Sequence, residues 1–169
     1  SKEHTGPLVG LKVIDLSTVV AGPGVAKYFA DYGADVIKIE RPAGDSTRSM
    51  GWTEPGETDS LWWKLVNRGK RSLILDLKND EDLSILKKLI DSADLLIENM
   101  RPGKIEQLGL DPEQLISRNP KLVVLRVSGF GQKGPYSQKP GFATIAEALS
   151  GLSSLLGEPD GVHCCHPLH

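Results

Sequence analysis

Short apolar runs alternate with amphipathic stretches along most of the chain. The runs stay apolar along their length instead of alternating with polar residues, which is typical of strands that are buried on both faces of a parallel sheet. Five such strands are predicted, at residues 11–16, 36–39, 72–77, 94–98 and 121–127.

Helix signals lie between these strands. A Gly-Pro-Gly turn at residues 22–24 suits the first turn of a helix and predicts one over residues 25–32. Asn79 is expected to cap the next helix, because three acidic residues follow it where the helix dipole favours negative charge. Asp111 is expected to cap another, and residues 142–156 have small and apolar side chains at helical spacing.

The order of elements predicts an α/β fold, a mostly parallel sheet with helices on both faces. In such folds ligands collect at the carboxyl ends of the strands, beside helix N-termini. Residues 17–24 and 40–45 are therefore the first places to expect a binding site. The connection over residues 42–59 is long for a compact domain, so it is expected to be functional or mobile.

Composition narrows the class of partner. A net charge of −2 gives no general reason to bind nucleic acid or a membrane. No apolar run approaches the roughly 20 residues of a transmembrane helix, and the polar residues 1–6 do not form a signal peptide. The two cysteines, Cys164 and Cys165, are adjacent and make a poor disulfide framework, so a cytoplasmic location is expected.

Cations follow several of the predicted strands. Arg41, Lys78, Arg101 and Lys104 would share one edge of the sheet with the helix start at Gly22, as a cradle for a phosphorylated ligand. The alternative is that these are ordinary solvated charges beyond strand ends. The pattern alone leaves both interpretations open.

Other motifs are weaker. Residues 129–134 match G-x-G-x-x-G, but no helix with a packing glycine follows, so a mobile loop is favoured over a dinucleotide site. The histidines and cysteines of residues 163–169 lack the spacing of a zinc site, and we expect a disordered tail and no metal. His4 is the only histidine outside that tail, so no serine–histidine–acid triad can be assembled.

Several segments, in order, resemble the class III CoA-transferases, a family that includes the carnitine CoA-transferase and formyl-CoA transferase types. The resemblance covers roughly residues 8–161. It is carried by residues 15–23 (DLSTVVAGP), 33–42 (GADVIKIERP), 44–48 (GDSTR), 67–72 (NRGKRS), 75–78 (LDLK), 99–103 (NMRPG) and 128–135 (SGFGQKGP).

The resemblance implies a Rossmann-like domain that binds coenzyme A and two chains that interlock as a homodimer. It also implies transfer of CoA between an acyl-CoA and a small carboxylic acid through an aspartyl-CoA thioester. Arg41 would contact the nucleotide phosphates, and the backbone of residues 75–78 and Asn99 would hold the adenine and pantetheine portions. The positions that match CoA-contacting segments are Val20, Ala21, Arg41, Leu75, Asp76, Leu77, Lys78, Asn99, Met100 and Arg101.

Three departures from the family pattern matter. Many relatives have glutamine or another polar residue near the position of Val20, whose side chain cannot donate a hydrogen bond. Phe142 and Ala143 stand where racemases of the same superfamily have a histidine and an aspartate, which argues against racemase chemistry. Residues 162–169 replace the segment that carries the nucleophilic aspartate, and Asp160 does not match it, so no catalytic residue is assigned.

Three functions follow from the resemblance. The leading one is the N-terminal portion of a class III CoA-transferase, truncated before its nucleophile and inactive by itself. In this interpretation residues 1–161 are a partial Rossmann-like CoA-binding domain and residues 162–169 a non-matching tail. The alternatives are a CoA-binding or dimerisation module without catalysis, and an acyl-CoA racemase or isomerase.

Overall fold

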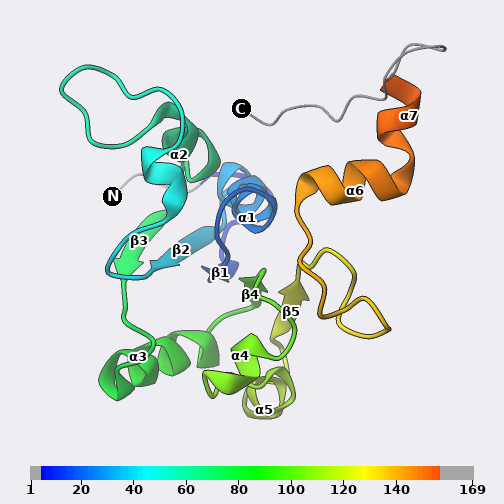
Figure 1. The fold of residues 1–169 in the computed structure, drawn as a ribbon. Coiled ribbons are helices and arrows are strands. Elements are labelled where there is room, and N and C mark those ends of the chain that lie inside the picture. The colour runs from blue at the N-terminus through cyan, green and yellow to red at the C-terminus, as the bar shows by residue number, and fades with distance from the viewer. Residues whose placement is uncertain (1–4, 157–169) are drawn as a thin grey trace. The chain divides into compact units, whose positions relative to one another are not determined.

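The structure, a computed structural model, describes residues 5–156 and contains one five-stranded sheet (Figure 1). Every pair of neighbouring strands is parallel, in the order β3-β2-β1-β4-β5. The strands are β1 (Lys12–Asp15), β2 (Asp35–Glu40), β3 (Arg71–Ile74), β4 (Leu95–Glu98) and β5 (Val123–Arg126). The predicted parallel sheet is confirmed.

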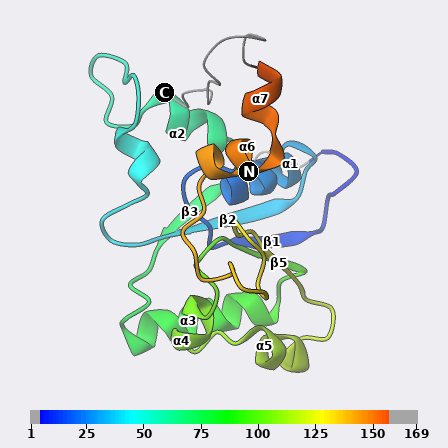
Figure 2. The same ribbon diagram turned by 45° about the vertical axis from the view of Figure 1, so that its right-hand side comes forward.

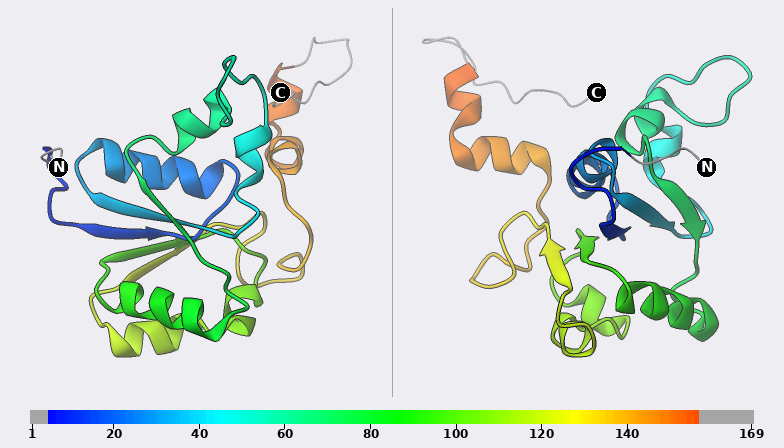
Figure 3. Two further views of the ribbon diagram at one scale, coloured as in Figure 1. Left: turned by 90° about the vertical axis from the view of Figure 1, so that its left-hand side faces the viewer. Right: turned by 180° about the vertical axis from the view of Figure 1, so that it is seen from behind.

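Helices cover both faces of this sheet, as predicted. In Figure 3 (left) the helices α1 and α2 lie above the strands, and α3, α4 and α5 lie below them. Figure 2 shows the same two layers from another side. These elements are α1 (Ala21–Asp31), the short 3-10 helix η1 (Ser46–Ser49), α2 (Leu61–Val66), α3 (Asp80–Asp91), α4 (Lys104–Gln107) and α5 (Pro112–Arg118).

The two faces of the sheet make separate cores, because alternate residues of a strand point to opposite sides. Val13 and Val36 pack with Ala26 of α1 on one face. Ile14 and Leu96 belong to the larger core on the other face, which includes side chains of α3, α4 and α5. The three central strands β1, β2 and β4 are largely buried, which fits their apolar runs, whereas the edge strands β3 and β5 are half-buried or exposed.

The predicted caps are present. The Asn79 Oδ1 accepts hydrogen bonds from the N–H groups of Glu81 and Asp82, and Asp111 caps α5, which has proline at its start. The first helix differs from the prediction, since α1 begins at Ala21 and includes the Gly-Pro-Gly sequence. Pro23 fits there because N–H groups in a first helical turn have no intrahelical partner.

The chain divides into two compact units, with the boundary between Val127 and Ser128. In the second unit a loop leads to α6 (Ala143–Ser150) and α7 (Leu152–Leu156), which are separated by Gly151 in the left-handed conformation. The loop over residues 129–134 is confirmed, since no helix follows it before Ala143. The predicted tail at residues 162–169 lies outside the described residues.

No helix in residues 5–156 is long and apolar enough to cross a membrane.

Candidate functional site at the carboxyl edge of the sheet

The strand order reverses beside β1, which gives the sheet a topological switch point. After β1 the chain crosses by α1 to β2 on one side, whereas β4 pairs with β1 on the other side. The connections that leave β1 and β4 therefore diverge at the carboxyl edge of the sheet. Parallel α/β sheets bind ligands at such a point.

The structure brings all ten predicted site residues to this edge. Val20 and Ala21 open α1 after β1, Arg41 follows β2, residues 75–78 follow β3, and residues 99–101 follow β4. These four strands are neighbours in the sheet, about 5 Å apart from one to the next. The segments therefore form a continuous row.

The ten residues are not equally available to a ligand. Six of them are exposed: Val20, Ala21, Arg41, Asp76, Lys78 and Arg101. Leu75 is only 4% exposed and belongs to the core, so it can offer a ligand only its backbone. The predicted backbone contact over residues 75–78 is compatible with this placement.

The N-terminus of α1 lies at the switch point without a side-chain cap. Val20 precedes the helix, and within residues 5–156 no side chain caps the N–H groups of its first turn. Free N–H groups and the helix dipole make such an end attractive to an anionic group. This arrangement is the strongest feature of the edge for phosphate recognition.

The turn between β1 and α1 is strained at Val19. Its φ of 68° is in the left-handed region, which a β-branched side chain rarely adopts. Such a conformation costs on the order of 1–3 kcal/mol and persists only where neighbouring groups impose it. The Asn99 side chain is one such group, since its Oδ1 accepts the Thr18 N–H at 2.8 Å and its Nδ2 donates to the Thr18 carbonyl at 2.7 Å.

A buried cluster of charges lies under this turn, on the face of the sheet that α1 covers. Asp15 and Lys38 are register partners on β1 and β2, and their charged groups lie 4.0 Å apart. Lys70 Nζ donates to Asp15 Oδ2, to the Pro23 carbonyl and to Asn67 Oδ1, each at 2.8 Å. Burial lowers the pKa of Lys70, and the Asp15 carboxylate partly offsets this effect.

A second ionic group fixes the long connection after β2. Arg48 donates two hydrogen bonds to the Glu40 carboxylate, at 2.8 and 2.7 Å, and one to Asp59 at 2.7 Å. Its guanidinium lies 3.8 Å from the centre of the Trp63 ring. Burial alone would raise the pKa of Glu40, but the hydrogen bonds from Arg48 and Ser72 outweigh it, so the pKa is lowered.

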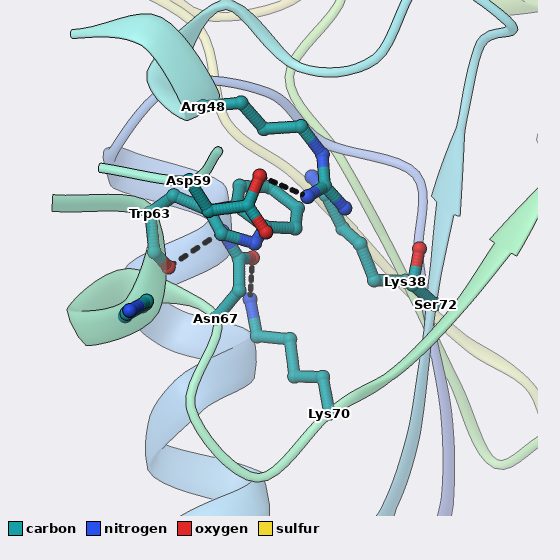
Figure 4. A pocket seen from close by; sticks show the side chains of 8 residues that line it. Lys38, Arg48, Asp59, Trp63, Asn67, Lys70 and Ser72 are labelled. Atoms are coloured by element: carbon teal, nitrogen blue, oxygen red, sulfur yellow. Dashed lines mark hydrogen bonds and ion pairs between the residues drawn. The ribbon is translucent and has the colours of Figure 1, made fainter. Parts of the chain in front are cut away.

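A cavity of about 160 Å³ opens between these two groups (Figure 4). Its lining residues are Lys38, Arg48, Asp59, Trp63, Lys64, Asn67, Lys70 and Ser72. None of the ten predicted residues lines it, and its cations are already paired with carboxylates. The cavity therefore belongs to the ionic network that supports the edge, and it is a poorer candidate for the ligand site than the edge itself.

No group of three or more metal-ligating side chains is found within residues 5–156.

Residues 8–168 match the family model for CoA-transferase family III. The chain belongs to this family. Among relatives in the family, the succinyl-CoA--L-malate CoA-transferase beta subunit of Chloroflexus aurantiacus is 46% identical over 158 residues, which are 93% of this chain and 39% of that protein. Human succinyl-CoA:glutarate CoA-transferase is 40% identical over 156 residues, 92% of this chain and 35% of that protein.

Two similar solved structures have the same fold. A CAIB/BAIF family protein from Brucella suis is 38% identical with a TM-score of 0.91, over 97% of this chain and 44% of that one. Rv3272 from Mycobacterium tuberculosis is 35% identical with a TM-score of 0.85, over 97% and 45%. The predicted class III CoA-transferase resemblance and the Rossmann-like α/β fold are confirmed. The chain spans about two fifths of the length of the relatives that it matches.

Sequence reasoning missed the ionic network beneath the edge. Asp15, Lys38, Asp45 and Arg48 all lie in segments that carried the family resemblance, yet they received no role. The available signal was a charged residue between apolar neighbours in each of two strands, Asp15 and Lys38. Their pairing depends on the register between β1 and β2, which the sequence pattern does not contain.

Proposed function

We propose that this chain is the CoA-binding portion of a class III CoA-transferase. The reaction is transfer of CoA from an acyl-CoA to a small carboxylic acid through an aspartyl-CoA thioester. The observation that carries the proposal is the row of four family segments at one sheet edge, beside the uncapped N-terminus of α1. The names of the relatives, which pair succinyl-CoA with malate or with glutarate, support this substrate class.

In this proposal the edge recognises CoA by charge and by backbone. The N-terminus of α1 and the exposed Arg41 and Arg101 attract the nucleotide phosphates. The backbone of residues 75–78 and of Asn99 and Met100 holds the adenine and pantetheine portions. Val20 has no polar side-chain atom, so its contribution is its main-chain N–H.

The covalent chemistry needs an aspartate carboxylate. It attacks the thioester carbonyl of the acyl-CoA and expels CoA thiolate, which leaves a mixed anhydride. The thiolate then attacks the aspartyl carbonyl, which forms the aspartyl-CoA thioester and releases the first acid. The acceptor carboxylate repeats the two steps in reverse. We assign no aspartate in this chain as that nucleophile, and we propose that the 169 residues alone bind CoA without turnover.

The family interpretation carries two further proposals. We propose that the whole protein works as an interlocked homodimer and in the cytoplasm. A racemase is disfavoured because Phe142, which is exposed at the start of α6, has no group that can take up a proton. A CoA-binding or dimerisation module without catalysis shares the same edge, so CoA binding is the property to test first.

Isothermal titration of the 169-residue chain with CoA tests the proposal. We expect saturable heat, and at least about tenfold weaker binding for Arg41→Glu, because it places a negative charge beside the phosphates. Lys121→Glu is the control: it makes the same charge change before β5, at the opposite edge of the sheet. Absence of saturable heat with the wild-type chain, or an equal loss in both variants, would contradict the proposal.

A further inference from the structure

The backbone of residues 17–19 is held by side chains that lie on or after the two neighbouring strands, β2 and β4. On the β4 side, Asn99 binds both polar groups of the Thr18 main chain. On the β2 side, Lys38 Nζ donates to the Ser17 carbonyl, and Asp45 Oδ2 accepts the Val19 N–H at 3.3 Å. Three consecutive residues of this turn are thus restrained by groups outside it.

Lys38 and Asp45 form the buried half of this restraint. Lys38 Nζ lies 3.3 Å from Asp45 Oδ2, and each side chain is only 1% exposed. The other carboxylate oxygen of Asp45 accepts hydrogen bonds from the N–H and hydroxyl of Thr47, at 3.0 and 2.8 Å. These bonds to Thr47 fix the Asp45 side chain within its own segment. Its bond to the Val19 N–H can therefore impose a conformation on the turn.

These contacts act on the segment that contains the strained residue Val19. Val19 adopts a positive φ that its side chain disfavours, and a free turn would relax toward negative φ. The next residues, Val20 and Ala21, open α1 at the switch point. The direction of the helix N-terminus therefore depends on groups that lie beneath the surface, where a ligand at the edge would not touch them.

We propose that Lys38 and Asp45 are positioning residues for CoA, which hold the turn at residues 17–19 so that the N-terminus of α1 faces the ligand. The inference rests on the proposed function for the identity of the ligand. Both residues act through the backbone of Ser17 and Val19. Loss of either breaks their buried ion pair and removes one of the hydrogen bonds that hold the turn.

Two variants separate positioning from general stability. Lys38→Met keeps the length of the side chain but removes its hydrogen-bond donor. Asp45→Asn replaces the carboxylate, which only accepts hydrogen bonds, with an amide, which accepts through its oxygen and donates through its nitrogen. We expect CoA affinity to fall about tenfold or more in each, as it does when the binding-competent conformation drops to a tenth of the population. The matched control is Asn119→Ala, which removes two side-chain hydrogen bonds to backbone carbonyls near the start of β4. It should reduce the melting temperature but leave CoA affinity within about twofold.

A ligand-free measurement keeps this inference distinct from the proposed function. Amide hydrogen exchange at Thr18 and Val19, whose N–H groups are hydrogen-bonded to side chains, should become faster in Lys38→Met and Asp45→Asn, and should stay at the wild-type rate in Asn119→Ala. Wild-type exchange at Thr18 and Val19 in both variants would overturn the positioning role even if the wild-type chain binds CoA. Faster exchange in a chain that binds no CoA would support the restraint and count against the proposed function.

Val19→Gly gives a third readout, because it removes the backbone strain at the turn. Glycine adopts positive φ without steric cost, so this variant should preserve the turn. In the Asp45→Asn background it should recover part of the lost CoA affinity. No recovery in the double variant, while the single Val19→Gly variant binds normally, would show that Asp45 does not act through the conformation of Val19.

Discussion

At the scale of single residues, the site depends on the close approach of the start of α1 to Ser17 as much as on charge. Gly22 lies in the first turn of α1, directly over Ser17. A Cβ atom built at Gly22 would lie 2.3 Å from both the Cβ and the Oγ of Ser17. Ser17 is itself buried and hydrogen-bonded to Asp15, so it cannot move aside easily. The glycine is therefore required where the helix begins.

We predict that Gly22→Ala destabilises the chain by about 1–3 kcal/mol, because the new methyl group must displace Ser17 or the helix start. Gly24→Ala is the matched control in the same helix, since a Cβ there meets nothing within 4 Å. It should be neutral or stabilising by up to about 1 kcal/mol, because alanine is the better helix former. Urea unfolding measures both, and a shift in the same direction for the two variants would contradict this account.

The sequence predicted little at this scale beyond the identity of candidate residues. It placed Val20, Arg41 and Asn99 at strand ends correctly. It gave no indication that the Asn99 side chain binds the Thr18 main chain, because the two residues are 81 positions apart and meet only when β1 pairs with β4. The sequence pattern also gives no indication of the strain at Val19, which lies in a run of apolar residues.

At the scale of elements, the connection after β2 is anchored to that strand by side-chain hydrogen bonds from η1. Residues 42–59 include η1, which Asp45 caps and Arg48 anchors between Glu40 and Asp59. The sequence flagged this connection as functional or mobile because of its length. The structure shows that its η1 part packs against α2, with Arg48 over the Trp63 ring.

The lowered pKa of Glu40 makes this anchor sensitive to acid. A carboxyl whose pKa is lower in the folded state stabilises the fold above its ordinary pKa, and the stabilisation is lost as the pH falls through the folded value. We therefore predict that Glu40→Gln reduces the free energy of unfolding at pH 7, and that the difference from wild type shrinks as the pH falls below the ordinary pKa of a glutamate. Urea unfolding of both proteins at several pH values checks this.

Lys88→Gln is the control for that experiment, since Lys88 lies on α3, which covers the opposite face of the sheet. Its difference from wild type should not follow the titration of Glu40. A constant gap between Glu40→Gln and wild type from neutral to acidic pH would mean that the Glu40 carboxylate does not stabilise the fold through its charge.

The strands, the caps and the fold class were predictable because they depend on local patterns. Apolar runs and capping residues such as Asn79 act within a few positions of the chain. The start of α1 and the division between α6 and α7 differed by a few residues, since a glycine inside a helical pattern can continue or end the helix. The ionic network required the register of β1, β2 and the turn before β3, which no local pattern specifies.

At the scale of the whole molecule, the chain belongs to CoA-transferase family III and spans about two fifths of the length of its relatives. We predict that the 169 residues alone transfer no CoA from succinyl-CoA to malate or glutarate, because no residue in the edge is assigned as the nucleophile. Chromatography of the reaction mixture measures this. A new acyl-CoA peak above the level without protein would contradict the prediction.

The central claim is that CoA binds at the carboxyl edge of β1 to β4, and amide chemical shifts in a CoA titration test it most directly. We predict concentration-dependent shifts at residues 20–21, 41, 75–78 and 99–101, and unchanged shifts around Asn119 at the opposite edge. Shifts confined to other parts of the chain, or none at saturating CoA, would contradict the account.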